Sequence, residues 1–138
     1  MKEAIRSFAL LAGVMAFSAI AGDDAELYFI APADGADVQG PVAVVFGLRG
    51  MGVAPAGIER PGTGHHHLII DAPLPPTGKP VPADGNHLHF GGGQTETVLD
   101  LPPGRHTLQL LLGDHLHMPL NPAVISKQIT ITVLPDGE

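Results

Sequence analysis

Residues 41–49 read PVAVVFGLR, and every second residue of this stretch is apolar. The alternating apolar residues are Val42, Val44, Phe46 and Leu48. Because successive side chains of a β-strand point to opposite faces, this period predicts a strand with one buried face. The stretch VISKQITITV (124–133) has the same period, with inward-facing residues expected at Ile125, Ile129, Ile131 and Val133.

Five more segments are typical of strands: ELYFI (26–30), HHHLIID (65–71), NHLHF (86–90), QTETVLDL (94–101) and RHTLQLLLG (105–113). The chain contains 18 Gly and 14 Pro, which suit turns between short strands, and no segment keeps a helical period for long. About seven strands of this kind predict an all-β fold, an immunoglobulin-like β-sandwich. A jelly roll or a small barrel is the structural alternative.

The N-terminus has the pattern of a secretory signal peptide. Lys2 and Arg6 precede an apolar run at residues 8–20, and Ala19-Ile20-Ala21 matches a cleavage site. The run is shorter than the roughly 20 residues that span a bilayer, so we expect cleavage and no membrane anchor. The sequence therefore predicts a signal peptide at residues 1–21 and a single domain at 22–138, located in the periplasm or secreted.

The composition of the mature chain excludes some partners. Removing residues 1–21 takes away two basic residues and one acidic residue, leaving 5 basic and 13 acidic residues and a net charge of −8. Such an acidic chain is a poor partner for nucleic acid or an anionic membrane. The chain has no Cys, so it has no disulfides and offers no thiolate to a metal ion.

Six of the eight histidines form three His-x-His pairs: His65 and His67, His87 and His89, and His115 and His117. Residues two apart in a strand share a face, with Cα atoms about 6.6–7 Å apart. Two such imidazoles can converge on one ion, since metal–nitrogen bonds are about 2.0–2.1 Å long. We therefore interpret these six histidines as candidate metal ligands.

The apolar pattern predicts which way the first pairs point. In HHHLIID the even positions, His66, Leu68 and Ile70, have more apolar weight and should face inward. That places His65 and His67 together on the outward face. By the same argument, His87 and His89 lie opposite Leu88 and Phe90. The pair in GDHLHMP (113–119) would join them if that loop lies at the same end of the sandwich.

The other two histidines are better explained by structure than by metal binding. His106 is in phase with Leu108 and Leu110 and follows a Pro-Pro-Gly turn, which favours a partly buried, hydrogen-bonded side chain. His66 belongs to the inward face. Asp71 and Glu96 could be carboxylates that orient metal-bound imidazoles, although Asp71 could equally be a turn residue.

An all-imidazole site suits Cu(II), Zn(II) or Ni(II), and Cu(II) binds most tightly in the divalent series. Met51 and Met118 could add thioether ligands, although Met is more often a packing residue. We therefore expect an exported metal-binding protein, a copper or zinc carrier or buffer, whose protein partner is unknown. A non-catalytic immunoglobulin-like interaction module is the alternative. A weaker one is a cupin-like metal-dependent enzyme with ligands at His87, His89, Glu96 and His106.

Three strings resemble a family of exported bacterial proteins catalogued as domain of unknown function 4399: residues 64–71, 87–114 and 125–133. The resemblance covers residues 27–134 and implies one compact β-domain behind a signal peptide. It supplies no established activity.

The family's histidine strings can be matched one by one to this sequence. Its Gly-His-His-His-Leu string corresponds to residues 64–68, and its His-x-His-Phe-Gly string to residues 87–91. Its Asp-x-x-His element corresponds to Asp114 and His117. Members often have a further His after the next Pro, where this chain has Leu120, and His115 is a possible substitute.

Overall fold

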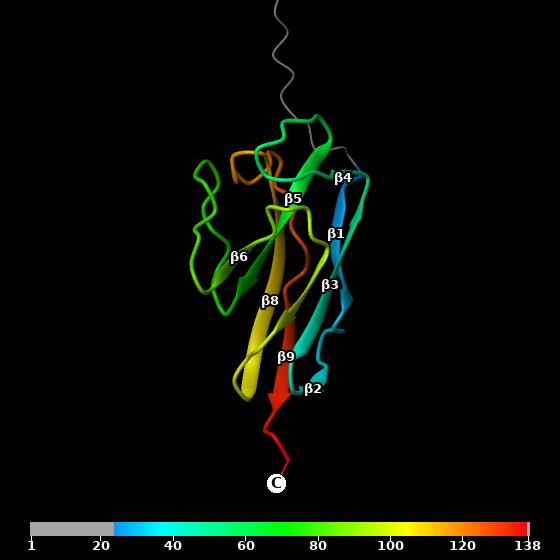
Figure 1. Cartoon of the computed structure of the whole chain (residues 1–138), viewed down its shortest axis with the longest axis vertical. Coiled ribbons are helices and arrows are strands. Elements are labelled where there is room, and N and C mark those ends of the chain that lie inside the picture. Colours follow the sequence, from blue (N-terminus) through cyan, green and yellow to red (C-terminus); the bar gives the residue numbers. More distant parts are fainter. Residues whose placement is uncertain (1–23, 138) are drawn as a thin grey trace, which may run out of the picture.

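The computed structural model describes residues 24–137, which form strands and no helix (Figure 1). Along the chain the strands are β1 (Glu26–Ala31), β2 (Asp37–Gln39), β3 (Val42–Arg49), β4 (Gly52–Val53), β5 (Thr63–Ile70), β6 (His87–His89), β7 (Glu96–Leu99), β8 (Gly104–Gly113) and β9 (Ile129–Leu134). Nothing in this part of the chain is a helix that could cross a membrane. The predicted signal peptide lies outside the described residues, and the division at residue 21 stays a prediction.

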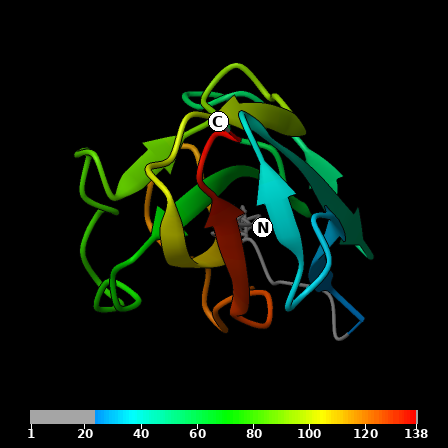
Figure 2. The ribbon, with the colours of Figure 1, turned by 90° about the horizontal axis from the view of Figure 1, so that it is seen from below.

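The strands form two sheets. The smaller has the order β1-β3-β7, and the larger has the order β2-β9-β8-β5-β4, with β6 also paired to β5. Neighbouring strands are antiparallel except for two parallel pairs, β2 with β9 and β4 with β5. Seen end-on in Figure 2, the strands curve around a shared interior. The all-β prediction is confirmed, with nine strands among residues 24–137 where about seven were expected.

The main core lies between the two sheets, and the predicted alternation places its residues there. On β3, Val42, Val44 and Phe46 are almost fully buried, as predicted. From the larger sheet, the even positions of β5 and β8 contribute Leu68, Ile70, Leu108, Leu110 and Leu112. The period of two along each strand therefore decides which residues form this core.

The two strands that the sequence did not predict, β2 and β4, have only three and two residues. Each lies in a stretch rich in turn residues and pairs in parallel with a strand distant in the sequence or beyond a loop. Such short strands exist because of tertiary pairing, and no local period marks them.

One predicted face is wrong before β9. Ile125 was expected to face inward with Ile129, but it is 41% exposed, whereas Ser126 is 4% exposed. Leu108 pairs with Ile129 and Leu111 with Ile125, so this chain segment advances four residues while β8 advances three. The extra residue is a β-bulge, and it reverses which residues face inward. The buried Ser126 hydroxyl accepts a hydrogen bond from the Leu110 N–H, which satisfies it.

His106 is the buried, hydrogen-bonded residue that its position predicted. Its Nδ1 donates to Asp71 Oδ2 and its Nε2 donates to the Pro102 carbonyl, both over 2.7 Å. Only the charged imidazole donates from both nitrogens, so these bonds favour the protonated form. The hydrogen bond to Asp71 is the main reason that the pKa of His106 is raised above its ordinary value.

This ion pair should make the stability of the fold depend on pH. The pKa of His106 is higher in the folded state than its unfolded value of 6.5. Protonated His106 therefore stabilises the folded state fully at pH values below 6.5, and this stabilisation is lost as the pH rises through the folded-state pKa. We expect Asp71→Asn to lower the free energy of unfolding by about 1 kcal/mol at pH 6 and by clearly less at pH 9. Asn also tolerates the positive φ of 52° at this position.

Urea unfolding of the metal-free protein and the variant at both pH values measures the difference. The comparison is made between the two proteins at each pH, because the lowered pKa values of His65, His66 and His67 also make stability depend on pH. An equal difference at pH 6 and pH 9 would contradict the role of the charged pair.

Candidate metal centre

Strand β5 is buried on both of its faces, and this decides the surroundings of three consecutive histidines. His66 faces the main core, where its ring centroid lies 5.0 Å from that of Phe46. His65 and His67 point away from that core, as predicted, but they do not reach solvent: they are 1% and 0% exposed. This face is covered as well: Val81 packs against Ile69 and Leu111, and the rings of two histidines from other segments pack against His65 and His67.

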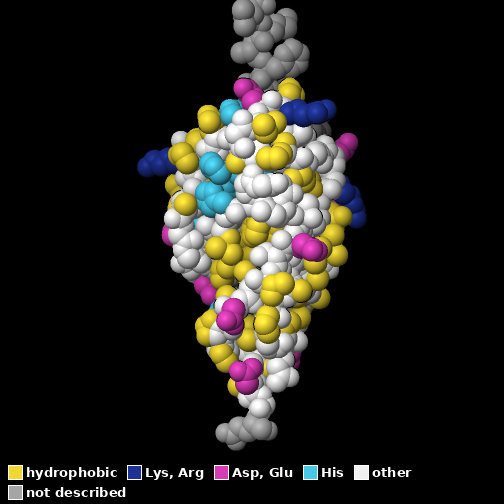
Figure 3. All heavy atoms as spheres, viewed as in Figure 1, with side chains coloured by type: hydrophobic (Ala, Val, Ile, Leu, Met, Phe, Trp, Pro, Cys, Tyr) yellow, Lys and Arg dark blue, Asp and Glu magenta, His cyan; other side chains and the backbone are white. Residues whose placement is uncertain are grey.

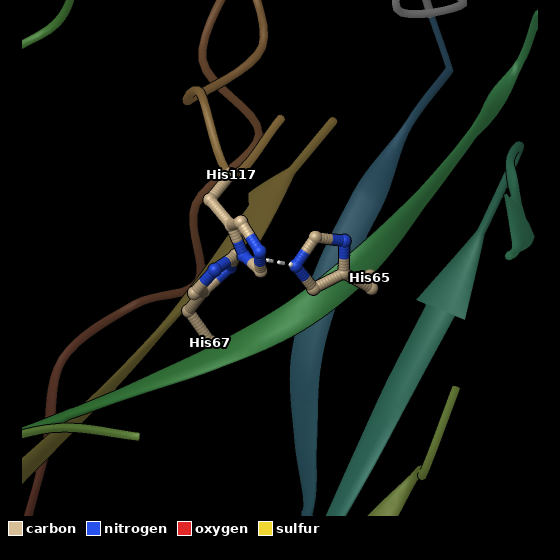
Figure 4. A group of neighbouring side chains, drawn as sticks. All are labelled: His65, His67 and His117. Carbon is tan, nitrogen blue, oxygen red and sulfur yellow. Dashed lines mark hydrogen bonds between the residues drawn. The ribbon is translucent and has the colours of Figure 1, made fainter. Parts of the chain in front are cut away.

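Two other segments bring histidines onto this covered face. In the antiparallel pairing of β6 with β5, His89 lies directly opposite His67, and the two ring centroids are 4.4 Å apart. His117 comes from the loop after β8, and its ring centroid is 4.8 Å from those of His65 and His89. Figure 4 shows the rings of His65, His67 and His117 turned toward one another.

The nitrogen atoms of this cluster have the spacing of ligands around one ion. His117 Nδ1 lies 3.0 Å from His65 Nε2 and 3.1 Å from His89 Nδ1. Two nitrogens bound to an ion at about 2.0–2.1 Å are about 2.9 Å apart at a right angle and about 3.3 Å apart at a tetrahedral angle. Ligand atoms of His65, His67 and His117 all lie within 4.8 Å of one another. A buried histidine cluster able to hold a metal ion is therefore present.

His67 has no polar partner of its own. Both of its ring nitrogens are buried and form no hydrogen bond within residues 24–137. Burial, followed by the neighbouring imidazoles, lowers the pKa of His67 to about 3 and that of His65 to about 4. Both rings are therefore neutral at pH 7, the form that a metal ion requires.

The 114–118 loop holds His117 in an unusual backbone conformation. Its φ is 62°, in the left-handed region that non-glycine residues seldom adopt. Asp114 organises this turn, because its Oδ1 accepts hydrogen bonds from the N–H groups of Leu116 and Met118, on either side of His117. Asp114 is therefore a positioning residue, and the Asp-x-x-His element was the one sequence signal for it.

Gly113 makes room for the His67 ring. A Cβ atom on Gly113 would lie 2.9 Å from His67 Nδ1 and still closer to Cε1. Gly113 lies opposite His65 in the β5–β8 pairing, so the His67 ring leans along the sheet over a position without a side chain. No sequence signal marked this glycine as part of the site.

The structure gathers four of the six predicted ligands and places two elsewhere. His87 is next to Ile69 in the strand pairing and hydrogen bonds Asp84 over 2.7 Å. His115 Nε2 lies 4.0 Å from Glu59 Oε2. The ring contacts of the cluster join His65, His67, His89 and His117 and include neither His87 nor His115. The cupin-like set is not assembled either, since Glu96 is exposed on β7 of the smaller sheet. Asp71, which was a candidate for orienting a metal-bound imidazole, hydrogen bonds His106 instead of a histidine of the cluster.

The cluster is not sealed from solvent. His89 and His117 are partly exposed, in contrast to His65 and His67. In the space-filling view of Figure 3, imidazole atoms form a patch on the facing side of the molecule. The partial exposure of His89 and His117 gives the cluster contact with solvent.

A family description, "Domain of unknown function (DUF4399)", matches residues 44–134. The chain belongs to this family. The matched range includes β5, β6 and the 114–118 loop, so the complete histidine cluster is part of the DUF4399 domain. The resemblance drawn from the three sequence strings is thereby confirmed.

The arrangement of strands also occurs in a much larger protein. An endo-beta-1,4-mannanase from Thermotoga petrophila is similar to 82% of this chain, with a TM-score of 0.50 and 16% sequence identity. The similarity covers only 20% of the mannanase chain, and at this identity it concerns the fold alone. None of the curated proteins compared with the DUF4399 chain matches it significantly.

The contact between Gly113 and His67 predicts a specific cost of adding one methyl group. Gly113→Ala should lower the free energy of unfolding by about 1–3 kcal/mol, because the new Cβ displaces a buried ring. Gly85→Ala is the matched control, since nothing lies within 4 Å of a Cβ there. Urea unfolding of both variants tests this, and equal stability of the two would contradict the close packing of His67.

Proposed function

We propose that this protein is an exported carrier or buffer of copper or zinc, which binds the ion between His65, His67, His89 and His117. The observation that carries the proposal is His67, whose two buried nitrogens have no hydrogen-bond partner while three other imidazoles surround them. A buried polar atom without a partner costs about 1–3 kcal/mol, and an ion at the centre of the cluster would be a partner for one of these two nitrogens.

The donor set supports the choice of metal. Imidazole nitrogens suit Cu(II) and Zn(II), whereas the oxygen ligands preferred by Mg²⁺ and Ca²⁺ are absent from the four-histidine cluster. Cu(II) has the highest affinity of the divalent series, so copper would occupy the site wherever it is available. The signal-peptide pattern supports a location in the periplasm or outside the cell, where an exported protein meets such ions.

The partial exposure of the cluster favours carriage over a closed structural site. His89 and His117 retain access to solvent, so an ion could enter and leave without unfolding of the domain. The anionic net charge of the mature chain would also attract cations.

We also infer that the sandwich is immunoglobulin-like. One sheet orders β1-β3-β7, which corresponds to strands A, B and E of that fold. The other orders β2-β9-β8-β5-β4, with β6 also paired to β5. Here β2 corresponds to a short parallel first strand, β9, β8 and β5 to strands G, F and C, and β6 to strand C′. In this assignment the cluster lies on the outer face of strands C and C′, on the side opposite the core.

Calorimetric titration of the untagged mature protein with Zn(II) and Cu(II) tests the proposed function. We expect one ion per chain, and His67→Ala should weaken binding by more than about 100-fold, because a ligand is lost. His115→Ala is the matched control, since it removes an imidazole of the same 114–118 loop that lies near Glu59 and outside the ring contacts of the cluster. Millimolar binding, or binding that His67→Ala leaves unchanged, would refute the metal site.

A further inference from the structure

Residues 72–85, here called the strap, connect β5 to β6 and lie over the covered face of the larger sheet. The strap has no strand of its own and is rich in proline. Its one deeply buried side chain is Val81, which is 4% exposed and packs against Ile69 and Leu111. This apolar contact holds the end of the strap beside the histidine cluster.

Two consecutive strap residues bind two different histidines of the cluster. The Val81 N–H donates to the His117 carbonyl over 2.8 Å. The Pro82 carbonyl accepts a hydrogen bond from His89 Nε2 over 2.7 Å. Both contacts depend on the position of the backbone at residues 81–82, and therefore on the burial of the Val81 side chain.

The Pro82 contact decides which nitrogen of His89 faces the cluster. A carbonyl only accepts hydrogen bonds, so Nε2 must carry the proton. In the neutral imidazole the other nitrogen, Nδ1, then has a free lone pair. That Nδ1 lies 3.1 Å from His117 Nδ1, on the inner side of the cluster. Metal-bound histidines generally donate their second N–H to a backbone carbonyl in this way.

Little else fixes the position of His89. Strand β6 has only three residues and pairs with β5 alone. Beyond it, the turn at residues 84–87 is held by Asp84, whose Oδ1 contacts His87 Nδ1 and the Asn86 N–H. The orientation of the His89 ring therefore depends on its contact with the strap, a segment without regular structure.

We propose that His89 is the fourth ligand of the ion through Nδ1, and that the Pro82 carbonyl is the group that positions it. This inference rests on the proposed metal site and adds that the strap controls release of the ion. When the strap is seated, the ion has four imidazole ligands. When Val81 leaves its contact with Ile69 and Leu111, His89 turns away and a coordination position opens, through which the ion is released or passed to another ligand.

The rate of metal release tests the strap. Zn(II)-loaded protein is mixed with an excess of a strong chelator, and the release rate is measured for the wild type, Val81→Ala, His89→Ala and the double variant. We expect Val81→Ala to speed release by about tenfold, the usual effect of disturbing a group that hydrogen bonds a metal ligand. In the His89→Ala background, Val81→Ala should have no further effect. Val98→Ala, the same change at a 67% exposed position, should leave the rate unchanged.

The absorption spectrum of Co(II)-loaded protein reports the coordination directly. The visible bands of Co(II) change in position when water replaces an imidazole, and they lose intensity when the coordination number rises above four. The wild type should show the intense spectrum of a four-coordinate ion, and His89→Ala should shift or weaken its bands. An unchanged spectrum in His89→Ala, or equal acceleration by Val81→Ala with and without His89, would overturn the proposal. Failure of the wild type to bind either ion would instead refute the metal site itself.

Amide hydrogen exchange of the wild type keeps the test independent of how well the variants fold. Binding of Zn(II) should slow exchange of the Val81 amide by about tenfold or more, because it holds the strap closed over His89 and His117. Exchange in β9, outside the cluster, should change little. Equal rates at Val81 with and without the ion would contradict the coupling between strap and metal.

Discussion

The structure depends on one constraint: strand β5 carries histidines on both of its faces, and their imidazole nitrogens are buried away from water. From Gly64 to Ile70 every residue of β5 is buried, one face by the opposite sheet and the other by the strap and the 114–118 loop. Because of this burial the rings on β5 are uncharged, so they can lie close together. For the same reason their unpaired nitrogens require a partner, which one ion could provide to several of them. The covering segments do more than pack: the strap contacts two cluster histidines, and Asp114 shapes the turn that presents one of them.

Much of the fold could be predicted from the sequence, because a period of two is a local property. It identified the long strands and the inward residues of β3, β5 and β8. It could not identify β2 and β4, which exist only through distant partners, nor the bulge before β9. One inserted residue there reverses the inward face, so Ile125 is exposed while Ser126 is buried. Such an insertion does not change the apolar period in the sequence, and it can be recognised only from the pairing with the neighbouring strand.

The same limits explain which of the six histidines come together. His65 and His67 were correctly placed together because they share a strand, although the segments packed on that face bury them. For the pair on β6, the strand register determines which histidine joins the cluster. His89 lies opposite His67, while His87 is two residues away along the strand and lies opposite Ile69. In the last pair, an i, i+2 spacing implies a shared face only in a strand. His117 has a positive φ in a turn, so its ring and that of His115 separate.

The cluster joins parts of the chain that are far apart in sequence, since His65 and His117 are separated by 52 positions. This matters in a chain without cysteine, which has no covalent cross-links. An ion held by both residues would act as a reversible substitute for a disulfide: it would restrict the unfolded chain as well as fill the native site. Closing a loop of that length by a covalent link is worth at most about 4 kcal/mol in the chain-entropy description. Resistance to unfolding would then depend on the supply of metal, so that the lifetime of the protein itself would report metal scarcity.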